Sequence, residues 1–155
     1  MFNWFRRKKK VNKYAVVVEA KLKLLEFLHK HNHSKLIPVF EQSIITTRDP
    51  IVYSMVEVHI GSLIALVEIE LENVDIEIRS KFNPWSRVIA WCYYGKSVIY
   101  LNTKYVSNSS NTAGTLMHEI LHLLGYTHPR KVTSRTRKHL PYTLGSYVKD
   151  EINNL

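Results

Sequence analysis

The chain has 155 residues, 45% of them hydrophobic, which suffices for one domain with a buried core and excludes a disordered chain. Its formal net charge of +9 and its pI near 9.7 favour an anionic partner, such as nucleic acid, a cell-wall polymer or a membrane surface. The single cysteine excludes an intrachain disulfide, and no apolar run reaches the ~18 residues of a transmembrane helix. We therefore expect a monomer with one domain over residues 1–155, cytoplasmic where it is made, although release by lysis or another route stays open.

The first thirteen residues predict a flexible basic tail. Five consecutive cations occupy Arg6–Lys10 and follow the aromatic residues Phe2, Trp4 and Phe5. Aromatic residues beside a polybasic run are also typical of segments that touch an anionic membrane, so a solvated tail and a membrane contact are both open. The segment lacks the apolar stretch of a secretory signal peptide.

Residues 14–30 predict an amphipathic helix that packs on one face of a sheet. The apolar positions recur at spacings of three and four residues, at Val17, Ala20, Leu24, Leu25 and Leu28. Three histidines follow at alternate positions, His29, His31 and His33. They either chelate a metal or end the helix in solvent.

The middle of the chain predicts strands separated by turn signals. Pro38 indicates that the first of them is an edge strand, and Gly61-Ser62 marks a break between the next two. The predicted strands cover residues 36–40, 51–60, 63–71 and 74–78.

Residues 88–94 and 97–102 predict a hairpin around the two-residue turn Gly95-Lys96. Strands followed by a further helix indicate an α+β domain with a mixed or largely antiparallel sheet.

A histidine motif occupies residues 118–128, whose sequence HEILHLLGYTH fits the pattern H-E-x-x-H-x-x-G-x-x-H. We expect a helix over residues 112–124, capped by Asn111 or Thr112. His118 and His122 are four residues apart, so both project from one helix face. Gly125 permits the sharp turn that brings His128 to the same ion. Three histidines leave one position open on zinc, as in catalytic sites.

Glu119 follows the first histidine and cannot bind the same ion in the same way. Its carboxylate can instead take a proton from a water at the ion and act as a general base. A structural zinc site usually has a fourth protein ligand, and no cysteine stands near the motif to supply one.

The motif resembles the zinc-binding helix of the metzincin metallopeptidases. The resemblance implies a zincin-like fold with a backing helix and an active-site helix. It implies one catalytic Zn²⁺ held by His118, His122 and His128, with Glu119 as the general base. It also implies that residues 97–102 form an edge strand that pairs with an extended peptide substrate. The expected function is that of a zinc-dependent endopeptidase.

Metzincins carry a methionine turn beneath the zinc, but no methionine follows His128 in this chain. Pro141 and Gly145 make residues 140–145 the best candidate for an equivalent turn. Tyr142 in this segment either approaches the metal, as a ligand or as a hydrogen-bond donor to the developing oxyanion, or simply packs on the final turn.

Residues 122–128 also resemble the small bacterial endoribonucleases that help mature ribosomal RNA. Those enzymes share the spacing of the three histidines but typically lack the glutamate after the first one. Glu119 therefore favours peptide hydrolysis, whereas the net charge favours RNA. Two alternatives stay open: a zinc-dependent endoribonuclease on the same three histidines, and a non-enzymatic, zinc-stabilised module that binds nucleic acid or a membrane. A second basic run follows the motif at Arg130, Lys131, Arg135, Arg137 and Lys138.

Overall fold

A computed structural model describes residues 11–31, 33–48, 60–81, 83 and 85–155. The described elements are α1 (Lys13–Lys30), the 3₁₀ turn η1 (His33–Leu36), α2 (Ile37–Glu41), α4 (Ile60–Asn73), β1 (Asp75–Arg79), β2 (Ala90–Cys92), β3 (Val98–Asn102), α5 (Ser109–Leu123), the 3₁₀ turn η2 (Thr136–Lys138) and α6 (Leu140–Asn153). The α+β class is confirmed. None of the described helices has the length and apolarity needed to cross a bilayer.

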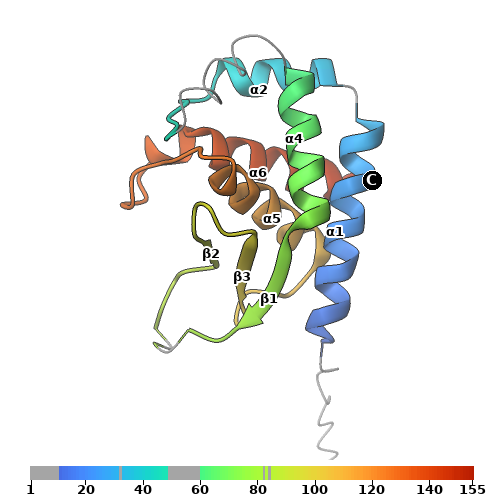
Figure 1. The fold of residues 1–155 in the computed structure, drawn as a ribbon, viewed down its shortest axis with the longest axis vertical. Helices are drawn as coiled ribbons and strands as arrows, with labels where there is room; N and C mark the ends of the chain where they lie inside the picture. The colour runs from blue at the N-terminus through green and yellow to red at the C-terminus, as the bar shows by residue number, and fades with distance from the viewer. Residues whose placement is uncertain (1–10, 32, 49–59, 82, 84) are drawn as a thin grey trace, which may run out of the picture.

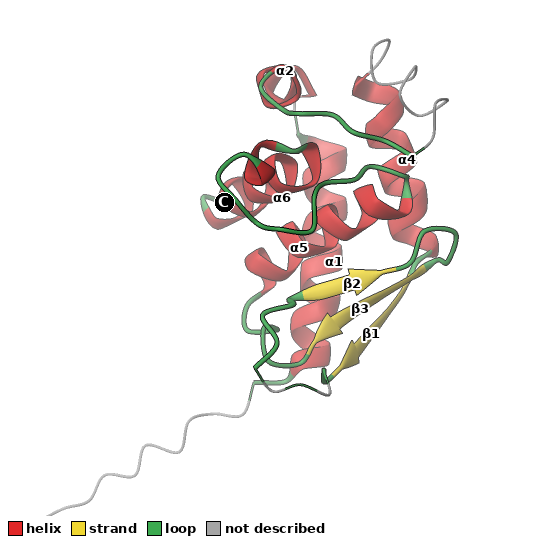
Figure 2. Cartoon of the chain, turned by 90° about the vertical axis from the view of Figure 1, so that its left-hand side faces the viewer, coloured by secondary structure: helices red, strands yellow, loops and turns green. Residues whose placement is uncertain are grey.

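The helix α5 lies at the centre of the molecule (Figure 1). The small sheet covers one side of α5, and α6 covers another, with α2 beyond it (Figure 2). The helices α1 and α4 lie alongside and complete the packing around α5. This arrangement surrounds the helix that carries the histidine motif with structured elements.

The sheet has the strand order β1-β3-β2. The strand β3 pairs in parallel with β1, with Glu77 opposite Tyr100, and antiparallel with β2, with Trp91 opposite Tyr100. The sheet is therefore mixed but not largely antiparallel. The prediction that residues 97–102 form an edge strand is wrong, because β3 is the central strand and β2 lies at the edge.

The predicted hairpin is confirmed, and Gly95 has the positive φ of 82° that its turn requires. The register places Cys92 opposite Ile99. The connection between the paired strands is therefore longer than the predicted two-residue turn.

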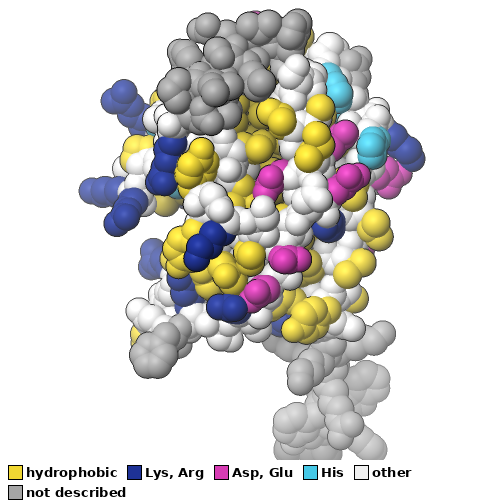
Figure 3. Space-filling model, in the orientation of Figure 1, with side chains coloured by type: hydrophobic (Ala, Val, Ile, Leu, Met, Phe, Trp, Pro, Cys, Tyr) yellow, Lys and Arg dark blue, Asp and Glu magenta, His cyan; other side chains and the backbone are white. Residues whose placement is uncertain are grey.

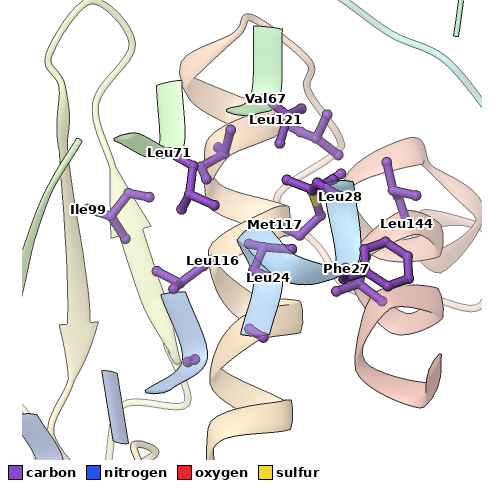
Figure 4. Packing of buried hydrophobic residues seen from close by; sticks show 14 of the residues in the cluster. Leu24, Phe27, Leu28, Val67, Leu71, Ile99, Leu116, Met117, Leu121 and Leu144 are labelled. Atoms are coloured by element: carbon purple, nitrogen blue, oxygen red, sulfur yellow. The ribbon is translucent and has the colours of Figure 1, made fainter. Parts of the chain in front are cut away.

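The core is built where the apolar sides of the helices meet the inner face of the sheet (Figure 4). The spacing in α1 produces the predicted buried stripe, although Leu25 is only partly buried and Phe27 belongs to the stripe. The labelled contacts come from α1 (Leu24, Phe27, Leu28), α4 (Val67, Leu71), β3 (Ile99), α5 (Leu116, Met117, Leu121) and α6 (Leu144).

The prediction of a strand over residues 63–71 is wrong, because this segment lies inside α4. Its buried side chains are Leu63, Ile64, Val67 and Leu71, which share one side of a helix. Gly61 and Ser62 stand in the first turn of α4 rather than between two elements. Burial of one helix face therefore decides the structure of this segment. The predicted strand at residues 51–60 lies outside the described residues, apart from Ile60, which begins α4.

Two segments predicted to be non-helical are helices with a proline in the first turn. Pro38 stands at the start of α2, so the edge strand predicted at residues 36–40 is wrong. Pro141 stands at the start of α6, so the turn predicted at residues 140–145 is wrong as well. In the first turn of a helix proline loses no hydrogen bond, because that N–H has no intrahelical partner.

The predicted basic tail ends earlier than residue 13. Asn12 caps α1, since its side chain accepts a hydrogen bond from the Ala15 backbone N–H at 3.2 Å, and Lys13 already belongs to the helix. Residues 1–10 lie outside the described residues.

Candidate metal centre

The helix α5 positions the first two histidines of the motif. It begins at Ser109, three residues before the predicted start, and Asn108 is the cap in place of Asn111 or Thr112. The Asn108 side chain accepts a hydrogen bond from the Asn111 backbone N–H at 2.8 Å. His118 and His122 follow on one face of α5, as their spacing predicts.

A glycine turn ends α5 and redirects the chain. Gly125 has a φ of 96°. The Gly125 N–H donates to the His122 carbonyl at 3.0 Å, and the Tyr126 N–H donates to the Leu121 carbonyl at 2.9 Å. These two bonds define the Schellman motif, whose left-handed position favours glycine. The turn lets His128 fold back toward α5, as the sequence predicts.

The three histidines converge through their Nε2 atoms. The Nε2 of His122 lies 3.1 Å from that of His118 and 3.0 Å from that of His128, and the third separation is 3.2 Å. Tetrahedral zinc with Zn–N bonds of about 2.0–2.1 Å separates its nitrogen ligands by about 3.3–3.4 Å. The observed triangle is within a few tenths of an ångström of that value. Among the described residues, these histidines form the only cluster of at least three His, Cys, Asp or Glu side chains able to share an ion.

The remaining ring nitrogens of the histidines face backbone carbonyls. His122 Nδ1 lies 2.7 Å from the Tyr126 carbonyl oxygen, and His128 Nδ1 lies 2.9 Å from that of Pro129. A carbonyl oxygen only accepts, so each Nδ1 carries the proton and each Nε2 presents a lone pair. Lone pairs this close repel unless a cation lies between them. The donor set therefore fits a metal ion, with the outer hydrogen bonds that usually orient metal-binding histidines.

Burial favours the neutral form of His118 and His122. Burial, followed by the charges of His122 and His128, lowers the pKa of His118 to about 3, and a backbone hydrogen bond with Pro141 opposes that shift. Burial also lowers the pKa of His122. Neutral imidazole is the form that binds a metal.

Two glycines allow α6 to approach the histidine face of α5. A Cβ atom on Gly114 would lie 2.5 Å from the Gly145 carbonyl oxygen, and one on Gly145 would lie 2.7 Å from the Gly114 carbonyl oxygen. Both distances are too short for any other residue without a shift of the backbone. The close approach brings the first turn of α6, with Pro141 and Tyr142, against His118.

Glu119 is buried, with 6% of its surface exposed. Burial raises the pKa of its carboxyl group to about 7, and a hydrogen bond from the Cys92 thiol opposes that shift. A carboxyl group with a pKa near neutrality can both take and release a proton at neutral pH. The residue is thus suited to the role that the motif predicts for it.

Tyr142 lies over two of the three histidine rings. The centroid of its ring is 4.5 Å from that of His118 and 4.6 Å from that of His128. Burial and the charge of Glu119 raise the pKa of its phenol, which therefore stays a hydrogen-bond donor at neutral pH. The structure places Tyr142 beside His118 and His128, although on a helix rather than on the predicted turn.

The edge strand β2 lies against the site. The Cys92 thiol is 3.4 Å from the Glu119 carbonyl oxygen, and burial raises the pKa of that thiol. Among the described residues, β2 pairs only with β3. One face of β2 therefore packs against α5 at Glu119, and its second edge has no strand partner among these residues.

Several features of the site could not be predicted from the sequence. The carbonyls that orient the histidines belong to the backbone, which no residue type reveals. The contact between Gly114 and Gly145 joins two helices that are far apart in the sequence. The only sign of it in the sequence is that Gly114 lies four residues, about one helix turn, before His118. Among the residues that the structure describes, His31 shares no metal-binding cluster; its ring stacks on Phe27, and its Nε2 lies 3.0 Å from the Tyr147 hydroxyl.

No family model, curated protein or solved structure matches the chain significantly.

Proposed function

We propose that this protein is a zinc-dependent endopeptidase. The observation that carries the proposal is the convergence of the His118, His122 and His128 Nε2 atoms within 3.2 Å of one another, with Glu119 next to the first of them in α5. This donor set has three protein ligands and a nearby carboxylate, which is the composition of catalytic zinc sites rather than of closed structural ones.

The three histidines would hold the ion, and Glu119 would move the proton. Zinc, when bound, lowers the pKa of a water molecule to about 7 and polarises a carbonyl group. The Glu119 carboxylate accepts a proton from the attacking water and donates it to the departing amine, so it returns to its starting form after each turnover.

Tyr142 would stabilise the charge that develops on the substrate carbonyl oxygen. Its phenol remains protonated near neutrality and its ring is fixed by the two histidines that it contacts. A donor held in place before the reaction is worth more than one that must reorient.

The edge strand β2 would hold the substrate. Ala90–Cys92 has backbone groups on the side away from β3, and an extended peptide can pair with such an edge. The Cys92 thiol contacts the Glu119 carbonyl oxygen, so β2 lies beside the helix turn that carries the proposed general base. This assignment moves the substrate strand from residues 97–102 to β2.

A second candidate function is that of a zinc-dependent endoribonuclease on the same three histidines. The exposed cations that follow His128 favour it, because phosphate groups bind to such surfaces. Glu119 and the free edge of β2 favour peptide hydrolysis instead.

The proposal is tested by metal content and peptide cleavage. Wild type and His128→Ala are purified without added metal and analysed for zinc, and the products of a mixed peptide library are identified by mass spectrometry. We expect about one zinc per wild-type chain, markedly less in the variant, and cleavage of peptides only by the wild type. A folded wild type without zinc would refute the metal site, and a zinc-loaded wild type that cuts RNA but no peptide would select the second candidate.

A further inference from the structure

The half of the chain that contains the site is almost free of negative charge. Glu119 is the only acidic residue between Glu77 and Asp150, and it is buried. The loop between α5 and α6 carries five exposed cations, none of which makes an ion pair with any described residue: Arg130, Lys131, Arg135, Arg137 and Lys138. Their charge is therefore not compensated within the described part of the molecule.

Hydrogen bonds hold this basic loop in one shape. Thr136 is buried, and its hydroxyl donates to the Lys131 carbonyl at 2.7 Å. The Thr136 N–H donates to the Thr133 hydroxyl at 3.1 Å. The loop begins directly after the ligand His128 and ends at α6, whose first turn contains Tyr142. Its cations are thus presented from a fixed backbone between two residues of the site.

A second segment adds a cation on the same side. Residues 44–48 are bonded on both sides of the basic loop. The N–H of Thr127, just before His128, donates to the Thr46 carbonyl at 2.7 Å, and the Ile44 N–H donates to the Lys138 carbonyl at 2.7 Å. The Arg48 N–H donates to the Gly125 carbonyl at 2.8 Å. Arg48 is exposed and close enough to contribute to the lowered pKa of His122.

The space-filling view agrees with this distribution. Lys and Arg side chains gather at the left-hand side of Figure 3, where Figure 1 shows the loop that follows α5. The acidic side chains visible on this face lie away from that group (Figure 3).

From this placement we propose that the substrate is an acidic peptide segment, with aspartate or glutamate side chains near the scissile bond that bind the cations around the metal centre. The inference rests on the proposed endopeptidase function and specifies its substrate. Uncompensated cations raise the local concentration of anionic ligands and accelerate their association. An acidic peptide fits better than a nucleic acid, because only a peptide main chain can pair with the free edge of β2.

Binding is measured first, on zinc-loaded Glu119→Gln, so that the result does not depend on turnover. The probes are a fluorescent peptide rich in glutamate and the same peptide with glutamine at every glutamate position. We expect the acidic peptide to bind about tenfold more tightly in about 50 mM salt, and the two affinities to approach each other in about 0.5 M salt. Equal binding of the two peptides at low salt would overturn the inference, as would tighter binding of a single-stranded RNA of equal length.

Variants show whether the loop is responsible. Arg130→Gln with Lys131→Gln, added to Glu119→Gln, should lose most of the preference for the acidic peptide while the zinc content stays the same. The matched control, Lys30→Gln, removes a cation of α1 that is already paired with Glu26 and should leave the preference intact. An unchanged preference in the loop variant would indicate that the peptide carboxylates bind the metal directly, and would overturn the role of the loop.

Hydrolysis separates this inference from the function on which it rests. If wild type cleaves both peptides at equal kcat/KM and binding shows no preference, the endopeptidase proposal survives and the acidic substrate does not. If the acidic peptide binds preferentially but neither peptide is cleaved, the charged surface stands and the endopeptidase proposal fails.

Discussion

At the scale of single residues, the environment of Glu119 differs from that of every other carboxylate with a described side chain. The others are exposed or partly exposed, whereas Glu119 is buried in α5, where this helix contacts β2. Burial stabilises the protonated form and raises the pKa to about 7. A purely structural role would be better served by an apolar residue, since burial of a carboxyl group is costly.

The variant Glu119→Gln should retain zinc and lose turnover. The amide has almost the same shape as the carboxyl group but cannot take a proton, so we expect kcat to fall by about 10²–10⁴. Elemental analysis and peptide hydrolysis measure the two properties on one preparation. A variant that keeps the wild-type rate would eliminate Glu119 as the general base.

The variant Tyr142→Phe isolates the hydroxyl group from the ring. Phenylalanine preserves the contacts with His118 and His128 but removes the donor, so we expect kcat to fall about tenfold to a hundredfold with little change in KM or zinc content. If steady-state kinetics show an unchanged kcat, Tyr142 serves only to pack against the ligands.

At the scale of elements, the packing of α6 on α5 determines the surroundings of the histidines. The glycine contact fixes how closely the two helices approach, and this distance brings Pro141 and Tyr142 to His118. The ligands themselves lie on α5 and the loop after it, so α6 acts on their orientation rather than on their identity.

The variant Gly145→Ala should weaken both the fold and the site. Its Cβ atom would stand 2.7 Å from the Gly114 carbonyl oxygen, so the helices must move apart. We expect a loss of about 1–3 kcal/mol in the free energy of unfolding and a weaker affinity for zinc. Denaturant unfolding and a zinc titration measure these effects.

A matched control is Gly61→Ala in α4, where a Cβ atom would meet no atom of the described residues within 4 Å. Alanine has the higher helix propensity, so the free energy of unfolding should stay the same or rise by up to about 1 kcal/mol. Equal behaviour of the two variants would show that the contact between α5 and α6 is not tight.

At the scale of the whole molecule, the metal would add a link between α5 and the loop that follows its C-terminal turn. His118 and His122 belong to α5, and His128 belongs to the loop that continues through the basic segment to α6. A ligand that binds only the folded state stabilises that state by mass action.

Removal of the metal should therefore lower the melting temperature. With zinc at 100 to 1,000 times its Kd, the expected stabilisation is about 3–4 kcal/mol, or about 10 °C in a domain of this size. Calorimetry of chelator-treated and zinc-loaded protein measures it, with His128→Ala as the control that should no longer respond. An equal melting temperature for the two wild-type samples would argue against a zinc site.

The sequence by itself determined the local features of this protein. Spacings of three and four residues predicted α1, and the fixed spacing of the motif predicted that three histidines share one site, because these relations depend on helix geometry and on one glycine turn. The strand at residues 74–78 and the hairpin also follow from local patterns, of alternation and of turn residues.

Only the tertiary structure decided the features that depend on distant neighbours. Residues 63–71 are helical because one side of them is buried against α1 and α5, and β3 is central because β1 and β2 pair on either side of it. Tyr142 reaches the histidines because Gly114 and Gly145, thirty-one positions apart in the chain, let two helices touch. A local sequence pattern cannot predict such contacts, because the free energy that stabilises them comes from burial and packing between segments remote in sequence.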